Sequence, residues 1–310
     1  MEFGKRPRRI DGVRTEYREE PCKSALSPVK GMRFGWSLNP YMGCAHRCTF
    51  CYVRAFERRA DRPSDDRYGT SIRVKTNIVE VLRAELRRRS WKRESVTIGA
   101  ATDPYQPAEG RYRLTRQCIE ALTASRTPFN IITRGPLVVR DIDVLVEASM
   151  RVEVQVTLSV PTLDLDIWRK TEPGTAPPRK RLEAMRRLVA AGIYAGVSLA
   201  PVMPGLTDGA ANMAAVFEAA SAAGATHAWC GPLNLRPGTR EHFLDGIAAD
   251  WPELLPRYLR LYEKSPYLAR ADAEPIHERF REEMDRYDIR DRREQHFTPP
   301  PEPVQLALGW

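Results

Sequence analysis

Cysteines and long apolar runs are both scarce in this chain. Six cysteines in 310 residues are too few for a scaffold held together by disulfides. No stretch reaches about 18 consecutive apolar residues, which excludes a transmembrane helix. Residues 1–6 include basic side chains, but no apolar run follows them, which excludes a secretory signal. These absences predict a cytosolic (cytoplasmic) protein with no membrane partner.

Acidic residues are outnumbered over most of the chain. The 49 Lys and Arg residues against 40 Asp and Glu give a formal net charge of +9. Residues 1–240 hold 39 basic and 25 acidic residues, whereas residues 241–310 hold 10 and 15. Such an excess attracts polyanions such as nucleic acid, but an arginine-rich solvated surface has the same composition. The hydrophobic fraction of 42% is enough for a sizeable core and excludes a disordered chain.

Strand-like and helix-like segments alternate after residue 33. Short apolar runs rich in β-branched residues predict six strands, at 34–38, 96–100, 129–133, 152–160, 194–200 and 227–230. Apolar residues at helical spacing predict helices at 78–89, 116–124, 139–148, 180–191 and 211–223. The predicted helix caps are Thr115 and Asp141 at N-termini and Gly192 and Gly224 at C-termini. This alternation, with few polar residues inside the strands, indicates an α/β protein with a buried parallel sheet.

The ends of the predicted strands carry unusual residues. Right-handed crossovers turn such a chain into either a doubly wound sheet or a barrel, and in both folds ligands collect at the carboxyl ends of the strands. Here those ends bring polar residues and prolines to one rim, among them Asp103, Arg134 and Ser159. Proline and glycine also end strands without any functional role, and this alone accounts for each strand taken singly.

The two ends of the chain differ from this central part. Residues 1–33 are charged and poor in periodicity, so we expect an extension that packs over the main domain or stays partly mobile. The C-terminal part shows no further strand pattern; 250–264 and 276–288 are predicted helical, and the proline-rich stretch 298–303 is predicted extended. The predicted division is an N-terminal extension (1–33), an α/β domain (34–240) and a C-terminal helical segment with a proline-rich tail (241–310).

Three of the six cysteines lie within eight residues, at Cys44, Cys48 and Cys51. Their C-x3-C-x2-C spacing comes directly after the first predicted strand. Thiolates this close together are unfavourable unless a metal centre neutralises their charge. A [4Fe–4S] cluster normally takes four cysteines, so three ligands leave one iron open, and an open iron can bind a substrate.

Two alternatives to a cluster stay open for these cysteines. A zinc site could use the three thiols and a histidine. His46 lies between two of the thiols, which makes joint coordination awkward, but His227 or His242 could replace it. The three thiols could also be reduced and buried with no metal. The strand context and the aromatic flanks agree better with a cluster.

The segment 44–51 resembles the hallmark of the radical S-adenosylmethionine (SAM) superfamily, C-x3-C-x-Φ-C, with Phe50 as the aromatic residue Φ. Segments 39–44, 102–107, 133–137 and 200–208 are similar to the spore photoproduct lyase-like branch, often labelled DNA repair photolyases, over roughly residues 35–240. The resemblance implies a partial (β/α)6 barrel in which three cysteines hold a [4Fe–4S] cluster and the fourth iron chelates SAM. It implies a reaction in which an electron cleaves SAM and the resulting 5′-deoxyadenosyl radical abstracts hydrogen from the substrate.

The resemblance also implies residues that bind SAM, besides Cys44, Cys48 and Cys51 as cluster ligands. Phe50 is expected beside the adenine, and Val202 and Met203 are expected to line the adenine side of the pocket. The residues expected around the amino-acid part of SAM come from strand ends: Thr102 and Asp103 at the amino group, Arg134 at the carboxylate, and Ser159 nearby.

One departure from the lyase pattern bears on the reaction. The lyase has a hydrogen-donating cysteine just before its counterpart of residues 102–103, whereas residues 99–101 of this chain hold no thiol. Tyr105 and Cys230 are our candidate catalytic residues for hydrogen donation, and Tyr52 is a third possibility that nothing in the sequence selects. Cys230 ends a strand at the functional rim.

Three further polar or thiol side chains have expected positions. Cys118 falls on the apolar face of a predicted helix and is most simply a core thiol. Gln106 and Glu109 follow the 102–105 motif and either face the substrate or are solvated in a loop.

Three functions agree with these observations. The first is a radical SAM enzyme, lyase-like or transferase-like, that acts on a lesion or base in DNA or RNA and takes its electron from a donor such as flavodoxin or ferredoxin. The second, motivated by the missing thiol, is a radical SAM enzyme that acts on a peptide or small metabolite. The third is a non-enzymatic zinc or iron–sulfur protein that binds nucleic acid. We predict a radical SAM enzyme and prefer the first function.

Overall fold

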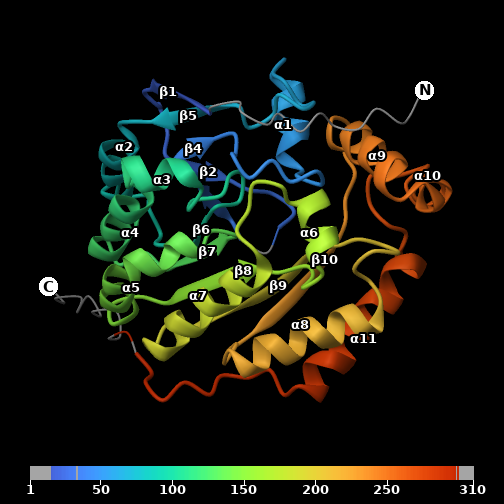
Figure 1. Ribbon diagram of the computed structural model, residues 1–310. Coiled ribbons are helices and arrows are strands. Elements are labelled where there is room, and N and C mark those ends of the chain that lie inside the picture. Colours follow the sequence, from blue (N-terminus) through green and yellow to red (C-terminus); the bar gives the residue numbers. More distant parts are fainter. Residues whose placement is uncertain (1–14, 33, 298, 300–310) are drawn as a thin grey trace, which may run out of the picture.

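A sheet of seven strands forms the centre of the computed structural model, which describes residues 15–32, 34–297 and 299 (Figure 1). Six of the strands are parallel and follow one another in chain order across the sheet. They are β3 (Trp36–Leu38), β6 (Val96–Ile98), β7 (Phe129–Thr133), β8 (Val154–Ser159), β9 (Ala195–Val202) and β10 (Ala228–Pro232). This order is that of a partial (β/α)6 barrel, so the six predicted strands and the predicted α/β class are confirmed.

The barrel is open at one side. The strand β2 (Leu26–Pro28) pairs antiparallel with β3, so β2 and β10 are the two edges of the sheet within the described residues. The division of the chain at residues 33 and 240 stays a prediction.

The two faces of the sheet differ in polarity because alternate residues of a strand point to opposite sides. In β8, Val156 and Leu158 pack in the main apolar core with the helices that cover the outer face. Ser159 points to the inner face, where its hydroxyl accepts a hydrogen bond of 3.0 Å from Ser198 of β9. Apolar side chains therefore hold the helices on the outside, while hydroxyl groups line the inside.

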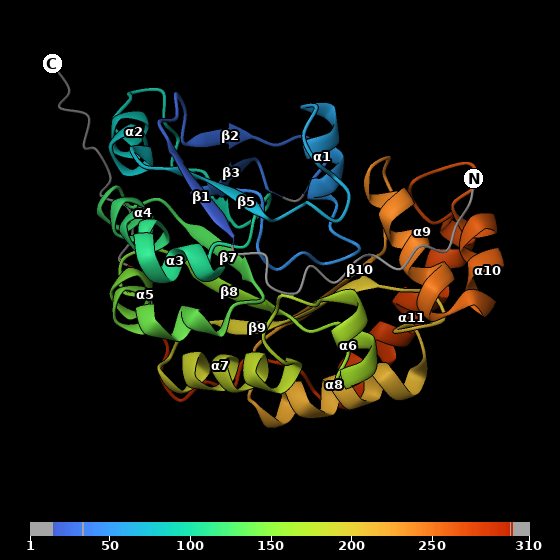
Figure 2. The ribbon, with the colours of Figure 1, turned by 45° about the horizontal axis from the view of Figure 1, so that its top comes forward.

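Five helices confirm the predicted helical segments, with somewhat different limits. They are α2 (Ile78–Leu86), α4 (Leu114–Ala124), α5 (Ile142–Ser149), α7 (Pro178–Ala190) and α8 (Ala210–Ala222). Gly192 and Gly224 follow α7 and α8 with φ of +81° and +78°, the left-handed conformation that ends helices. Figure 2 shows α7 and α8 side by side along one side of the sheet.

Two predicted N-caps behave differently from expectation. Thr115 is not the cap of α4, because the helix begins after Arg113 and the carboxylate of Glu109 accepts the Thr115 N–H at 2.9 Å. Asp141 does occupy the N-cap position of α5, at the end of a 3-10 turn, η1 (Pro136–Asp141). Its side chain does not cap the helix, because it pairs with Arg140 and Arg116 instead.

Several short elements were not predicted. A second sheet has the order β1 (Glu16–Glu20), β5 (Ser71–Lys75) and β4 (Tyr41–Met42), so part of the N-terminal segment pairs with the chain that follows the cysteines. Three short helices lie in the strand-to-helix connections: α1 (Val53–Arg59), α3 (Pro107–Tyr112) and α6 (Leu165–Thr171). Elements of this length give too few repeats for a periodic pattern to be read from the sequence.

The C-terminal part is helical, as predicted, but its helices have other limits. The structure has α9 (Thr239–Asp250), η2 (Pro252–Leu254), α10 (Leu255–Leu261) and α11 (Arg270–Arg286), of which α9 was missed. Phe280 of α11 packs against Phe217 of α8, with ring centroids 5.2 Å apart. Apart from residue 299, the proline-rich stretch predicted as extended lies outside the described residues. Among those that are described, none of the helices combines the length and apolar character needed to cross a membrane.

Candidate metal centre

The cysteine loop, residues 43–51, connects β4 to α1 and lies between two apolar clusters. Cys44 and Cys48 are buried, and Cys51 is half-buried. Cys48 packs with Phe50 and Met203 in a cluster that includes side chains of α9 and α10. Cys44 packs with Val53 and Tyr68 in another, and Cys51 contacts both clusters. The loop therefore joins the barrel to the C-terminal helices.

The buried thiols are poor acids in this environment. Burial raises the pKa of Cys44 well above its usual value, and the nearby Asp103 carboxylate, Cys51 and Cys48 raise it further. Burial also raises the pKa of Cys48, to about 12, although Arg134 acts in the opposite direction. Such thiols ionise only when a positively charged centre binds them, as a metal cluster does.

One buried arginine holds the backbone of the loop in place. Arg54 is 1% exposed, and its Nη1 donates to the backbone oxygens of Ser64 and Asp65 at 2.8 and 2.7 Å. Its Nε reaches the carbonyl oxygen of Cys48 at 3.4 Å, and its guanidinium lies 4.6 Å from the ring centroid of Tyr68. The Tyr68 hydroxyl in turn lies 3.5 Å from the sulfur of Cys51. Sequence reasoning missed both Arg54 and Tyr68.

Gln106 clamps the start of the cysteine loop to the end of strand β6. Its Oε1 accepts from the Ala45 N–H at 3.0 Å, and its Nε2 donates to the Gly43 carbonyl at 3.1 Å and to the Thr102 hydroxyl at 2.8 Å. Thr102 also donates to the Gly43 carbonyl, at 2.7 Å. Gln106 and Glu109 are both fully buried. The expectation that they face the substrate or a solvated loop is therefore wrong.

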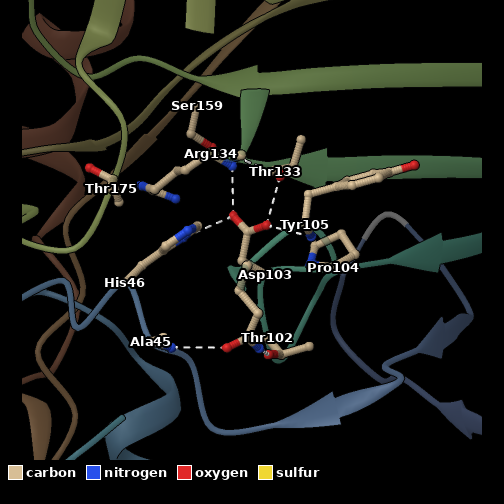
Figure 3. Close-up of polar contacts among 12 residues, drawn as sticks. Ala45, His46, Thr102, Asp103, Pro104, Tyr105, Thr133, Arg134, Ser159 and Thr175 are labelled. Carbon is tan, nitrogen blue, oxygen red and sulfur yellow. Dashed lines mark hydrogen bonds and ion pairs between the residues drawn. The ribbon is translucent and has the colours of Figure 1, made fainter. Parts of the chain in front are cut away.

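Asp103 uses both carboxylate oxygens within the protein (Figure 3). Oδ1 accepts from the Tyr105 N–H and the Thr133 hydroxyl at 2.9 and 2.7 Å, and Oδ2 accepts from the Arg134 N–H at 2.6 Å. Nδ1 of His46 lies 3.3 Å from Oδ2, within ion-pair distance but not aligned as a hydrogen bond. Burial raises the pKa of Asp103, but His46 and the hydrogen bonds outweigh it and lower the pKa to about 2. Asp103 thus ties the cysteine loop to the end of β7.

Arg134 belongs to a buried ion-pair network. Its Nε donates to Oε2 of Glu172 at 2.9 Å, and its Nη2 donates to the Ala200 carbonyl at 2.7 Å. Arg181, which is fully buried, donates to the same oxygen of Glu172 at 2.7 Å. The Arg134 guanidinium lies 5.2 Å from the ring centroid of Phe50. The network fixes a cation beside Cys48 and Phe50; the sequence indicated Arg134 but not its buried partners.

The turn that carries Glu172 is packed directly against the cysteine loop. The Thr49 N–H donates to the Thr171 carbonyl at 2.9 Å, and the Gly174 N–H donates to the His46 carbonyl at 3.0 Å. A Cβ atom at Gly174 would lie 2.4 Å from the Ala45 carbonyl oxygen, so only glycine fits there. The loop is therefore held from both sides, by Gln106 on one and by this turn on the other.

The remaining residues expected around SAM lie in or next to this region. Ser159 is 2% exposed and bonded to Ser198 on the inner face of the sheet, and its carbonyl accepts from Arg181 at 2.8 Å. Met203 is fully buried in the cluster that contains Cys48 and Phe50. Val202 is buried in the main core instead.

The two candidate hydrogen donors point away from the cysteine loop. Figure 3 shows the ring of Tyr105 directed away from His46 and Arg134. Burial, followed by the charges of Asp141 and Glu109, raises the pKa of the Tyr105 hydroxyl. Cys230 lies at the outer face of β10, with its sulfur 3.4 Å from Nδ1 of His277 in α11, and burial raises its pKa to about 11.

Two other residues considered for thiol or hydroxyl chemistry have clear positions. Cys118 is fully buried in the main core, as expected for a core thiol. The hydroxyl of Tyr52, the residue after the last cysteine of the loop, donates to the Ala100 carbonyl. Burial raises the pKa of Tyr52.

The structure gives no support to a mononuclear zinc site. Among the described residues, no group of three His, Cys, Asp or Glu side chains is arranged to hold a single metal ion. His227 contacts Thr157, at 3.0 Å, and Gln155 near the amino ends of the strands. Nδ1 of His242 in α9 lies 3.6 Å from Asp66. Each cysteine of a cluster binds a different iron atom, so the thiols do not need to converge on one point.

Three of the seven buried side-chain atoms without a hydrogen-bond partner in the described residues lie in or beside the cysteine loop. They are Nε of Arg47, Oε1 of Glu172 and Nδ1 of His46, of which the last still lies at ion-pair distance from Asp103. Buried polar atoms are rarely left unpaired without a reason such as a bound group. Together with the raised pKa values of the buried thiols Cys44 and Cys48, they fit a metal cluster with a polar ligand beside it.

The fold is a partial barrel with three cysteines in one loop at the carboxyl ends of its strands, and comparison with known proteins identifies the family. Residues 38–216 match the Radical SAM superfamily, and the chain belongs to it. As a member, it is an enzyme that uses a [4Fe–4S] cluster and SAM, so the predicted family and cofactors are confirmed.

Individual relatives are similar over different lengths. An uncharacterized protein of Mycobacterium tuberculosis is 39% identical over 308 residues, which cover 96% of this chain and 89% of that protein. The Radical SAM Nalpha-GlyT isomerase of Pseudomonas phage M6 is 30% identical over 192 residues, 61% of this chain and 37% of that protein.

Solved structures show the same fold. A spore photoproduct lyase mutant with bound AdoMet and dinucleoside spore photoproduct superposes with a TM-score of 0.66 at 13% identity, covering 87% of this chain and 79% of that one.

Gly174→Ala tests whether the Glu172 turn must touch the cysteine loop. We expect a loss of about 1–3 kcal/mol in the free energy of unfolding, because a Cβ cannot be accommodated against two backbone carbonyls. The matched control is Gly110→Ala, at a helical glycine with open space around its Cβ position, which should stabilise by up to about 1 kcal/mol. Chemical denaturation measures both, and equal stability of the two variants would contradict the contact.

Phe243→Ala tests whether the C-terminal helices support the cysteine loop. Phe243 shares a cluster with Cys48 and Phe50, whereas the equally buried Phe217 lies in the main core. Either change to alanine should cost about 3–5 kcal/mol of stability. Only Phe243→Ala should also accelerate iron loss from the reconstituted protein, measured as iron and sulfide per chain after anaerobic gel filtration. Equal retention in both variants would show that the helices do not support the loop.

Proposed function

We propose that Cys44, Cys48 and Cys51 are the cluster ligands of this radical SAM enzyme and that SAM binds beside Arg134. The observation that carries the proposal is a fixed cation next to Cys48, at the carboxyl ends of the strands. When bound, the cluster supplies the electron that cleaves SAM, and the cleaved SAM takes hydrogen from the substrate. The chain's own residues bind, orient and shield these groups.

Arg134 is suited to the carboxylate of SAM because it is oriented before SAM binds. Glu172 and Ala200 hold two of its nitrogens, so its guanidinium needs no reordering to form a charge-assisted hydrogen bond. Phe50 lies 5.2 Å from this guanidinium, at the side where the adenine is proposed. Met203 shares the cluster of Phe50 and supports the same side.

The contacts of Asp103 and Thr102 favour a positioning role over direct binding of the SAM amino group. Asp103 holds Arg134 and His46, and Thr102 holds the carbonyl of Gly43. We propose that both set the distance between the cysteine loop and the strand ends, with Ser159 completing the wall of the site and Val202 packed behind it in the main core.

We propose a nucleic acid, with a damaged or modified base in DNA or RNA, as the substrate. Residues 1–240 hold 39 basic and 25 acidic residues. This net positive charge supports a nucleic-acid substrate because it attracts phosphates. The spore photoproduct lyase structure with a similar fold contains a bound dinucleoside spore photoproduct. A base inside a duplex would leave the stack to reach the site. We also propose a flavodoxin-like or ferredoxin-like electron donor. The proposed location is the cytosol, which the six unpaired cysteines support.

A peptide or small metabolite is the second candidate substrate. The observation that favours it is the lack of a thiol at residues 99–103, where the lyase pattern has its hydrogen donor. The side chains of Tyr105 and Cys230 do not replace that thiol, since they point away from the cysteine loop.

Deuterium tracing separates the two substrates. Reconstituted enzyme, SAM and dithionite are incubated anaerobically with oligonucleotides, peptides or metabolite pools in deuterated and ordinary forms, and 5′-deoxyadenosine is analysed for deuterium. We expect deuterium from an oligonucleotide, with binding that weakens steeply as salt rises, by about 0.9 log units per log unit of salt for each phosphate contacted. Label from peptides or metabolites alone would refute the nucleic-acid assignment.

Arg134→Gln tests the SAM carboxylate contact. We expect the Kd for SAM, measured by anaerobic equilibrium dialysis, to rise about tenfold or more, because a hydrogen bond to a charged group contributes about 1.5–3 kcal/mol. Arg134→Lys should recover part of the affinity. The control, Arg186→Gln, removes an exposed arginine of α7 that pairs only with its neighbour Glu183 among the contacts seen. Parental SAM affinity in Arg134→Gln, with its iron content intact, would contradict the role.

A further inference from the structure

Trp229 is an exposed aromatic residue on the inner face of the open edge strand. In the register of β10 with β9, Trp229 pairs with Ser198, whose hydroxyl faces inward to Ser159. Its neighbour Cys230 faces outward, to His277 of α11. The two observations place the Trp229 side chain on the inner face, and it is 36% exposed there. Trp229 belongs to none of the apolar clusters formed by the described residues, so its exposed ring edge is not explained by core packing.

The neighbours of Trp229 are small. A Cβ built at Gly231 would lie 3.2 Å from Cζ3 of Trp229 and 3.9 Å from Cβ of Ala200. The ring therefore leans toward the carboxyl end of β10, beside the residue whose carbonyl holds Arg134. With glycine and alanine at these positions, 36% of the Trp229 side chain stays exposed.

Seven residues after Trp229, Arg236 supplies a positive charge. Its Nε donates to the Tyr267 hydroxyl at 3.1 Å, and its guanidinium lies 5.6 Å from the centroid of that ring, which is 48% exposed. Thr239 then donates to the Cys51 carbonyl at 2.9 Å. The stretch from Trp229 to Thr239 thus runs from the inner face of the sheet to the proposed cluster site.

We propose that the stretch from Trp229 to Thr239 binds a single strand of the substrate, with one base stacked on Trp229 and a backbone phosphate paired with Arg236. The inference rests on the proposed nucleic-acid function and assigns its contacts to residues. Base–aromatic stacking contributes about 1–3 kcal/mol per base, and proteins that bind single strands combine such stacking rings with basic side chains that follow the backbone phosphates. The alternative group that could stack on the Trp229 indole is the adenine of SAM.

The test uses reconstituted holoenzyme and a labelled single-stranded oligonucleotide, with an abasic strand of the same length. Trp229→Ala should raise the Kd of the base-containing strand about tenfold and leave the Kd of the abasic strand unchanged. Trp229→Phe should retain most of the affinity. Arg236→Gln should weaken both strands and reduce the salt slope by about one. The control, Met150→Ala, truncates a side chain that is 48% exposed and lies between α5 and β8, and should change nothing.

Each contrary outcome has a separate meaning. If the parental enzyme binds neither strand, the nucleic-acid function fails and the inference fails with it. If it binds the base-containing strand and Trp229→Ala binds it equally, only the inference is overturned. If Trp229→Ala instead raises the Kd for SAM and leaves oligonucleotide binding unchanged, the ring serves the adenine and the inference is overturned. Thermal melts and Trp229→Phe establish that any loss does not come from misfolding.

Discussion

The clamping of the cysteine loop between Gln106 and the turn of Glu172 and Gly174 is the constraint on which the site depends. Within the described residues the loop has no regular secondary structure, so its shape is set by hydrogen bonds from elsewhere. Gln106 bonds it to the end of β6, and the turn at Gly174 packs on its other side. Because both contacts are made to backbone atoms, the positions of the thiols are fixed without using any thiol as a structural group.

Buried charge is concentrated at the same place and is nearly balanced there. Asp103, Arg134, Glu172 and Arg181 connect the ends of several strands, and each carboxylate accepts from at least two donors. Breaking such a network leaves an unpaired buried charge, which is strongly unfavourable. The network therefore maintains one arrangement of the strand ends, and with it a guanidinium beside Cys48. The C-terminal helices contribute by packing on Phe50 and excluding water from one side of the loop.

The strands and the cysteines could be predicted from the sequence because their signals are local. Runs such as that of β8 are continuous and β-branched, and the three thiols have a fixed spacing. The clamps could not be predicted, because Gln106 meets Ala45 across 61 positions and Glu172 meets Arg134 across 38. Gln106 was expected to face substrate or solvent for the same reason: residues near it in the sequence do not reveal that it contacts a loop from a distant part of the chain. Cys230 was expected to end a strand at the rim, but β10 continues to Pro232, and the outward direction of the Cys230 side chain depends on register.

Cluster assembly in single cysteine variants tests the central claim most directly. Cys44→Ala, Cys48→Ala and Cys51→Ala are each reconstituted anaerobically beside Cys118→Ala, a core thiol with no place in the loop. Iron and sulfide per chain and the reduced-cluster EPR signal are then compared. The account predicts that each loop variant loses the cluster and the release of 5′-deoxyadenosine, while Cys118→Ala keeps about four irons and four sulfides. An intact cluster in any loop variant, with SAM cleavage at the parental rate, would contradict it.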